Sequence, residues 1–90
     1  MPNKYAKTVQ DTLDLHQYTK DEAQIAVLEF LDKSESAGYV LIRIIVGKGI
    51  HSENGPVLGD FVRNFLDEKG YEYGNAKINE GADGAIDVVL

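Results

Sequence analysis

The chain has 90 residues, of which 43% are hydrophobic and 27% charged, as expected for one soluble globular domain. The absence of cysteine excludes disulfides and cysteine-based zinc sites, and no apolar run is long enough for a secretion signal or a membrane span, so we expect a cytoplasmic domain without membrane contact. Because the net charge is −6, binding of nucleic acid would require a local patch, a metal ion or the basic surface of a partner.

The start of the chain is predicted to be a loose end followed by a strand. Residues 1–8 are polar, and we expect them to be flexible. Residues 9–16 alternate in part between apolar and polar side chains, which favours a short strand that directs Leu13 and Leu15 into a core.

A helix is predicted next. Thr19 precedes Glu22 by three positions, just before an apolar run, which is the signature of a capping box at a helix N-terminus. Apolar residues then recur at helical spacing to about Ser36. Gly38 is expected to end the helix, because glycine readily adopts the left-handed backbone found after helix C-termini.

The middle of the chain predicts a second strand and a second helix. Residues 40–46 are almost all apolar and β-branched, which is typical of a strand covered on both faces in a parallel sheet. A loop over residues 47–55 leads to Pro56, which suits a first helical turn. An apolar stripe over residues 58–66 predicts the helix, and Gly70 its end.

The last third of the chain predicts two strands joined by a short loop. Residues 71–78 alternate between apolar and polar side chains, with Gly74 expected at a β-bulge. A loop over residues 79–84 returns the chain into a final strand at residues 85–90.

The element order β-α-β-α-β-β predicts an α/β fold with a mostly parallel four-stranded sheet and an antiparallel last strand. In this topology His16, Val46 and Ile78 lie at the carboxyl ends of parallel strands, so the loops that follow them emerge at one edge. Open α/β sheets bind ligands at this edge, and we therefore expect the functional site there.

Two histidines and one aspartate could supply chemistry at this edge. Asp14 and His16 are two positions apart on a strand, so both side chains leave the same face, where a carboxylate can orient an imidazole or share a metal ion with it. With His51 they could form an acid/base or metal-binding cluster. The alternatives are an exposed polar strand end and a solvated loop histidine.

A glycine-containing loop could hold a phosphate. Gly47-Lys48-Gly49 follows a buried strand and precedes a helix, so its backbone amides and the lysine could approach an anion. The spacing fits neither a P-loop nor a dinucleotide-binding fingerprint. The alternative is a tight turn. The five tyrosines are typical of packing residues, but Tyr18, next to His16, could contact a base.

The motifs together resemble the Smr (small MutS-related) domain family. Leu13-Asp14-Leu15-His16 is similar to the Leu-Asp-x-His motif that opens the family, and Thr19 with Glu22-Ala23 resembles its Thr-x-x-Glu-Ala helix start. Gly47-Lys48-Gly49 resembles its second signature, His-or-Thr-Gly-x-Gly.

The later residues extend the resemblance. The stretch from His51 to Leu58 is similar to a longer variant of the second loop, and Gly81 to Leu90 resembles the closing loop and strand of the family. The resemblance therefore covers about residues 11–90.

The resemblance implies a two-layer α/β sandwich, like the C-terminal domain of bacterial translation initiation factor three. It also implies binding of DNA or RNA in repair, recombination or ribosome-linked processes, in some members with DNA-nicking or RNA-cleaving activity. In those members the Asp and His of the first motif, here Asp14 and His16, are implicated in cleavage or binding.

Two positions depart from the family pattern. Gln17 replaces the glycine that commonly follows the first motif, which makes the strand exit stiffer. Val46 stands in place of the His or Thr before Gly-x-Gly, which removes a polar group that could contact a substrate.

Three functions follow from these observations: an endonuclease, a non-catalytic nucleic-acid-binding module, and a protein-interaction domain of a larger repair or translation factor. An endonuclease of this kind could work with or without a divalent metal ion, and the sequence does not identify residues that would bind one. We assign catalysis to Asp14, His16 and His51, and binding of nucleic acid or phosphate to Gln17, Tyr18, Gly47, Lys48, Gly49, Ser52, Asn54, Gly55 and Gly84.

Overall fold

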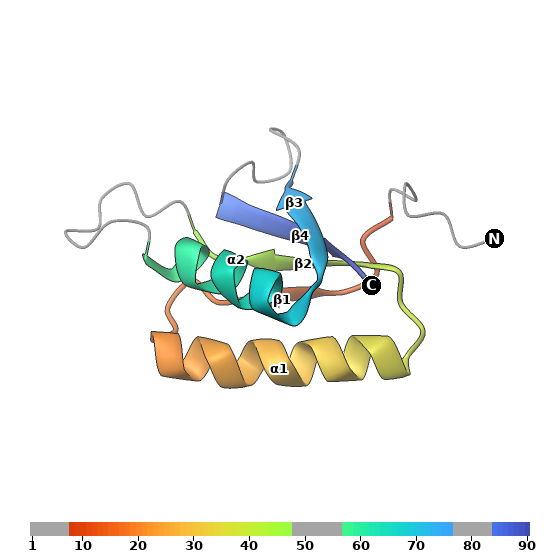
Figure 1. Ribbon diagram of the computed structural model, residues 1–90, viewed down its shortest axis with the longest axis horizontal. Helices are drawn as coiled ribbons and strands as arrows, with labels where there is room; N and C mark the ends of the chain where they lie inside the picture. Colours follow the sequence, from red (N-terminus) through yellow and green to blue (C-terminus); the bar gives the residue numbers. More distant parts are fainter. Residues whose placement is uncertain (1–7, 48–56, 77–83) are drawn as a thin grey trace.

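The computed structural model describes residues 8–47, 57–76 and 84–90. The predicted flexibility of residues 1–7 lies outside this part. The elements follow the predicted order, and are β1 (Thr12–Asp14), α1 (Lys20–Ser36), β2 (Leu41–Ile45), α2 (Val57–Lys69), β3 (Glu72–Asn75) and β4 (Ala85–Val89) (Figure 1).

The four strands form one sheet in the order β1-β2-β4-β3. β1 and β2 are parallel, and β4 is antiparallel to both of its neighbours, β2 and β3. β1, β2 and β3 therefore run in one direction and β4 in the other, as predicted. The prediction did not give the order, in which the last strand lies between β2 and β3.

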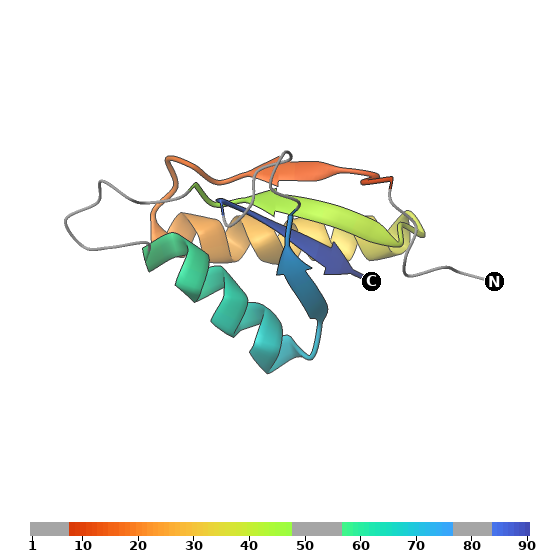
Figure 2. The same cartoon turned by 90° about the horizontal axis from the view of Figure 1, so that it is seen from above.

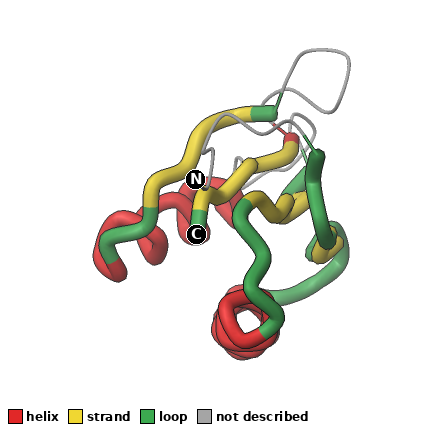
Figure 3. Tube along the Cα trace, turned by 90° about the vertical axis from the view of Figure 1, so that its right-hand side faces the viewer, coloured by secondary structure: helices red, strands yellow, loops and turns green. Residues whose placement is uncertain are grey.

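Both helices pack on the same face of the sheet, which gives the predicted two-layer sandwich (Figures 2 and 3). This arrangement corrects one expectation, since the apolar run at residues 40–46 favoured a strand covered on both faces, whereas helices cover only one face of β2. On the helix-free face, Arg43 Nε donates a hydrogen bond of 2.6 Å to Asp87 Oδ1 in the neighbouring strand. Between the layers lies one core, whose fully buried members include Leu15, Val27, Ile42, Ile44, Val62, Leu66, Ile86 and Val88.

Local sequence signals define both helices. The Thr19 side chain accepts a hydrogen bond from the Glu22 backbone, and the Glu22 carboxylate accepts one from the Thr19 backbone, so the predicted capping box is present. Gly38 and Gly70 follow the helices with φ of 77° and 80°, the left-handed conformation predicted for the residue after a helix end. In the described parts of the chain, no helix is long and apolar enough to cross a membrane.

Two strands differ from the prediction. Gly74 does not form a bulge, because it pairs with Asp87 in an unbroken register. β1 is shorter than residues 9–16, since it begins at Thr12 and ends at Asp14. Before it, the Gln10 N–H donates to the Leu41 carbonyl and the Arg43 N–H donates to the Asp11 carbonyl, and the Gln10 side-chain oxygen also accepts hydrogen bonds from the N–H groups of Val40 and Leu41.

Candidate functional site

A tight turn follows β1 and carries the first candidate residues. The Leu15 N–H donates to the Ile45 carbonyl at 2.8 Å, and the Tyr18 N–H donates to the Leu15 carbonyl at 2.9 Å. The Leu15 side chain is fully buried in the core. His16 therefore lies in a turn and not in the predicted strand, and the buried leucine fixes this turn against the end of β2.

Asp14 and His16 are in direct contact. Asp14 Oδ1 accepts a hydrogen bond of 3.0 Å from the His16 backbone N–H and lies 2.8 Å from His16 Nδ1. The backbone hydrogen bond first, and then the side-chain contact with the imidazole, lower the pKa of the Asp14 carboxyl group below its ordinary value. The carboxylate is thus charged across the neutral pH range.

This contact defines what His16 can do chemically. When Nδ1 carries the proton and donates a hydrogen bond to Asp14, the neutral imidazole has its free lone pair on Nε2. The His16 side chain is 60% exposed and that of Asp14 is 51% exposed, so solvent or a substrate can reach the pair. The pair can therefore transfer a proton at His16 Nε2, or provide one nitrogen and one oxygen ligand to a metal ion.

The end of β2 lies beside this turn and joins the last loop. The N–H groups of Val46 and Gly47 both donate to the Gly84 carbonyl, at 2.9 Å and 3.0 Å. Together with the bond from Leu15 to Ile45, these contacts bring the ends of β1 and β2 and the start of β4 to one edge. Of the predicted binding residues, Gly47 and Gly84 are therefore in direct contact.

Val46 is a core residue in this chain. Its side chain is 6% exposed and lies close to Gly59 in α2. Since alternate residues of a strand point to opposite faces, it follows Ile42 and Ile44 on the helix-covered face. The side chain at this position points away from the face that carries Asp14.

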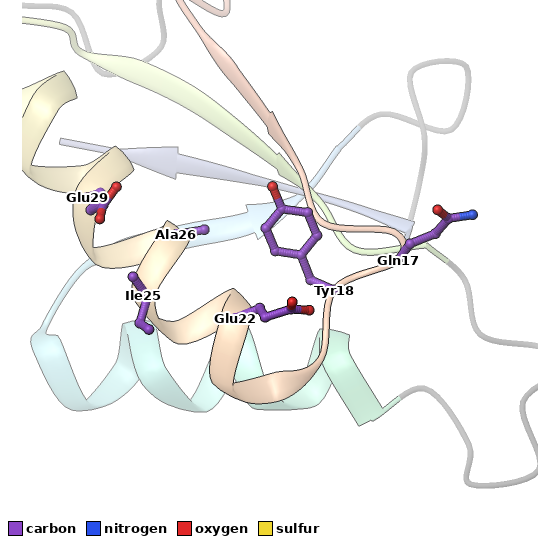
Figure 4. Close-up of a pocket in the computed structure, with 6 residues that line it drawn as sticks. All are labelled: Gln17, Tyr18, Glu22, Ile25, Ala26 and Glu29. Atoms are coloured by element: carbon purple, nitrogen blue, oxygen red, sulfur yellow. The ribbon is translucent and has the colours of Figure 1, made fainter.

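Gln17 and Tyr18 line a shallow cavity beside the turn (Figure 4). Four residues of α1 complete its lining, and sequence reasoning assigned none of them to a site. One available signal was Ile25, an apolar residue outside the apolar stripe of the helix, and 60% exposed. The four residues are Glu22, Ile25, Ala26 and Glu29.

The remaining predicted site residues lie outside the described part of the chain, so their distance from His16 stays a prediction. In the described part, His, Cys, Asp and Glu form no group of three that could hold a metal ion. The predicted site residues outside the described part are Lys48, Gly49, His51, Ser52, Asn54 and Gly55.

The fold and the edge define a small α/β domain with an aspartate–histidine pair at the end of its first strand. The sequence model of the Smr domain matches residues 13–90, and the chain therefore belongs to the Smr domain family. The resemblance inferred from the motifs is thus confirmed.

Solved structures of Smr domains share the fold. The chain is 27% identical to the Smr domain of Thermus thermophilus MutS2, with a TM-score of 0.79, covering 89% of this chain and 96% of that one. It is 26% identical to Escherichia coli YdaL, a stand-alone small MutS-related protein, with a TM-score of 0.79 and coverage of 88% and 63%. For the human small-MutS-related domain the identity is 26%, the TM-score 0.69 and the coverage 87% and 98%.

No curated protein matches the chain. Smr domains are known generally as nucleic-acid-binding domains.

Proposed function

We propose that this domain binds DNA or RNA at the edge where the Asp14–His16 turn meets Gly47 and Gly84, and that it cleaves a phosphodiester there. The observation that carries the proposal is the hydrogen-bonded Asp14–His16 pair, which is exposed at the end of a strand in an Smr domain. An orienting carboxylate and an accessible imidazole are the parts that general acid–base catalysis needs.

In the proposed reaction, His16 Nε2 accepts the proton of the attacking water or ribose hydroxyl. The oxygen attacks phosphorus, and the bond from phosphorus to the leaving oxygen breaks. Asp14 stabilises the imidazolium that forms, because its carboxylate already contacts Nδ1. His51 is proposed to protonate the leaving oxygen, and Lys48 with the loop amides to hold the phosphate.

Cleavage is tested with Asp14→Ala and His16→Ala, using labelled single-stranded, duplex and branched DNA and RNA. Both variants should lose cleavage and keep the circular dichroism spectrum of the original domain. Glu68→Ala, which removes an exposed carboxylate from α2, is the matched control and should cleave normally. Equal cleavage by all four proteins would contradict the proposal. Repeating the assay with EDTA and with added Mg²⁺ or Mn²⁺ measures metal dependence.

A second candidate function is binding without cleavage. It is favoured by Val46, which replaces the polar residue of the family pattern and is buried, so that position offers no group to a substrate. An NMR titration with the same oligonucleotides would then shift the amides of residues 14–18, Gly47 and Gly84, while no product forms. Phosphate-driven binding should weaken steeply as the salt concentration rises. Shifts confined to other residues would contradict both candidates.

A further inference from the structure

Three large hydrophobic residues are exposed on the described surface of α1 and of the turn that precedes it. The large hydrophobic residues exposed there are Tyr18 (43%), Ile25 (60%) and Leu28 (42%), which are close in sequence. Single exposed apolar residues are common on soluble proteins. Tyr18 and Ile25, however, share a surface cavity of about 550 Å³, which we call the α1 groove (Figure 4).

The α1 groove is built from the turn after β1 and the first half of α1. Tyr18 comes from the turn, and Ile25 and Ala26 come from the helix and supply apolar surface. Glu22 and Glu29 lie about one helical turn before and after them, because residues three to four apart share a helix face. The groove therefore has an apolar middle with a carboxylate toward each end.

The charges in the α1 groove select between possible ligands. Its lining contains two carboxylates and no lysine, arginine or histidine. Glu22 is held in place because its carboxylate also accepts the capping hydrogen bond from the Thr19 backbone. Two negative charges repel a phosphate backbone and attract lysine and arginine side chains.

We propose that the α1 groove binds a segment of a partner protein in which basic residues flank a large apolar residue. Glu22 and Glu29 are seven residues apart, which is roughly 10 Å along a helix axis. Side chains of an extended segment alternate between its two faces, so basic residues at positions i and i+4 with an apolar residue at i+2 direct all three side chains into the groove. The two basic residues are then about 13 Å apart, a span that their long side chains adjust to the two carboxylates. Asp14 and His16 lie outside the lining of the groove, whereas Gln17 and Tyr18 of the same turn belong to it.

The ligand chemistry can be tested by selecting binders to the whole chain from a library of random peptides displayed on phage. Selected peptides should be enriched in the basic–apolar–basic pattern, and they should shift the NMR signals of Ile25 and Glu29. Enrichment of peptides without basic residues would overturn the proposal, as would no enrichment above uncoated beads. A single-stranded DNA or RNA oligomer that shifts these signals when the peptides do not would assign the groove to nucleic acid.

Variants locate the binding site. The combination Glu22→Gln and Glu29→Gln should raise the Kd of a selected fluorescein-labelled peptide about tenfold, since each exposed ion pair contributes modestly. Glutamine also completes a capping box, so Glu22→Gln keeps the start of α1 intact. Ile25→Ser should weaken binding by a similar factor, because it removes apolar contact area.

Two controls keep these results specific. Glu68→Gln removes a charge from α2, and Leu28→Ser removes an exposed apolar side chain that lines a different cavity on α1. Both should bind the peptide with unchanged Kd. His16→Ala should also bind it normally, even if it no longer cleaves or binds nucleic acid. Equal affinity of all variants for the peptide would overturn the proposal.

Discussion

Two acid–base pairs in this domain differ mainly in their exposure. Asp14 and His16 approach to 2.8 Å, with side chains 51% and 60% exposed. Arg43 and Asp87 approach to 2.6 Å on the helix-free face of the sheet, with side chains only 15% and 24% exposed. Both pairs have short contacts, but only the first is open to a large substrate.

This difference in exposure separates a pair that a ligand can reach from a pair that joins two strands of the sheet. Arg43 and Asp87 are cross-strand partners of β2 and β4, and two hydrogen bonds join their side chains. A charged pair in such a half-buried place stabilises the fold only while both partners remain. Exposed pairs contribute little to stability, because water and salt screen them. The Asp14–His16 pair is therefore available for chemistry at small structural cost.

The largest expected effect is on the cleavage proposed for the exposed pair. His16→Gln should lower the rate of phosphodiester cleavage on the order of 10²–10⁴-fold, because it removes the acid–base group. The thermal unfolding midpoint should hardly move. Single-turnover cleavage and differential scanning calorimetry on the same samples check both statements. A large fall in the unfolding midpoint with unchanged cleavage would reverse the roles given to the two pairs.

Leu15 is the buried residue that anchors the Asp14–His16 turn to the core. Leu15→Ala removes a fully buried side chain between Asp14 and His16, and should lower the free energy of unfolding by about 2–5 kcal/mol. Urea unfolding measures this change. Ile25→Ala, on the exposed face of α1, is the control and should have little effect. Equal losses in the two variants would contradict the placement of Leu15 in the core.

Breaking the half-buried Arg43–Asp87 pair should lower the free energy of unfolding less than removing the Leu15 side chain from the core. Asp87→Asn should lower the free energy of unfolding by about 1–3 kcal/mol, because Arg43 loses its charged acceptor. Cleavage by the folded fraction should be unchanged. A double variant with Arg43→Met and Asp87→Leu should lose less stability than the single variant. If it loses more, the pair is more stabilising than apolar packing at this place.

The smallest effect concerns the pH dependence of Asp14. Because its pKa is lowered in the folded state, its contribution to stability is complete above the ordinary aspartate pKa and is lost as the pH falls through the lowered value. NMR titration of the carboxyl carbon should give a midpoint below the ordinary value, and His16→Ala should move this midpoint upward. An unchanged midpoint in the variant would mean that the imidazole contact has no effect on Asp14.

Local signals in the sequence predicted much of the fold. The capping box of Thr19 and Glu22, and the glycines at 38 and 70, depend on neighbouring residues alone, and both helices begin or end where these residues predicted. Gly74 was wrongly expected at a bulge, because glycine is also tolerated in a regular register, and only its pairing with Asp87 decides between the two.

Features that depend on distant residues could not be predicted. The apolar run at residues 40–46 favoured a strand covered on both faces, but helices cover only one face of β2, and on the other face Arg43 contacts Asp87 of β4. Likewise, the alternation of side chains along a strand predicted that Asp14 and His16 share one face. In the structure they do meet, but through the turn that contains His16 and not through a strand. A sequence signal for this turn was nevertheless present, because an aspartate side chain often accepts a hydrogen bond from the backbone N–H two residues later, as Asp14 does from His16.

The place of β4 between β2 and β3 has a consequence for the folding pathway. β1, α1 and β2 are consecutive and can assemble early, but Leu41 pairs with Val89, far along the chain. β3 pairs in the sheet with β4, so β3 has no strand to pair with until residues 85–89 are available. Such distant pairings slow folding relative to local ones. During synthesis, we therefore expect the sheet to be completed only when β4 pairs with β2 and β3.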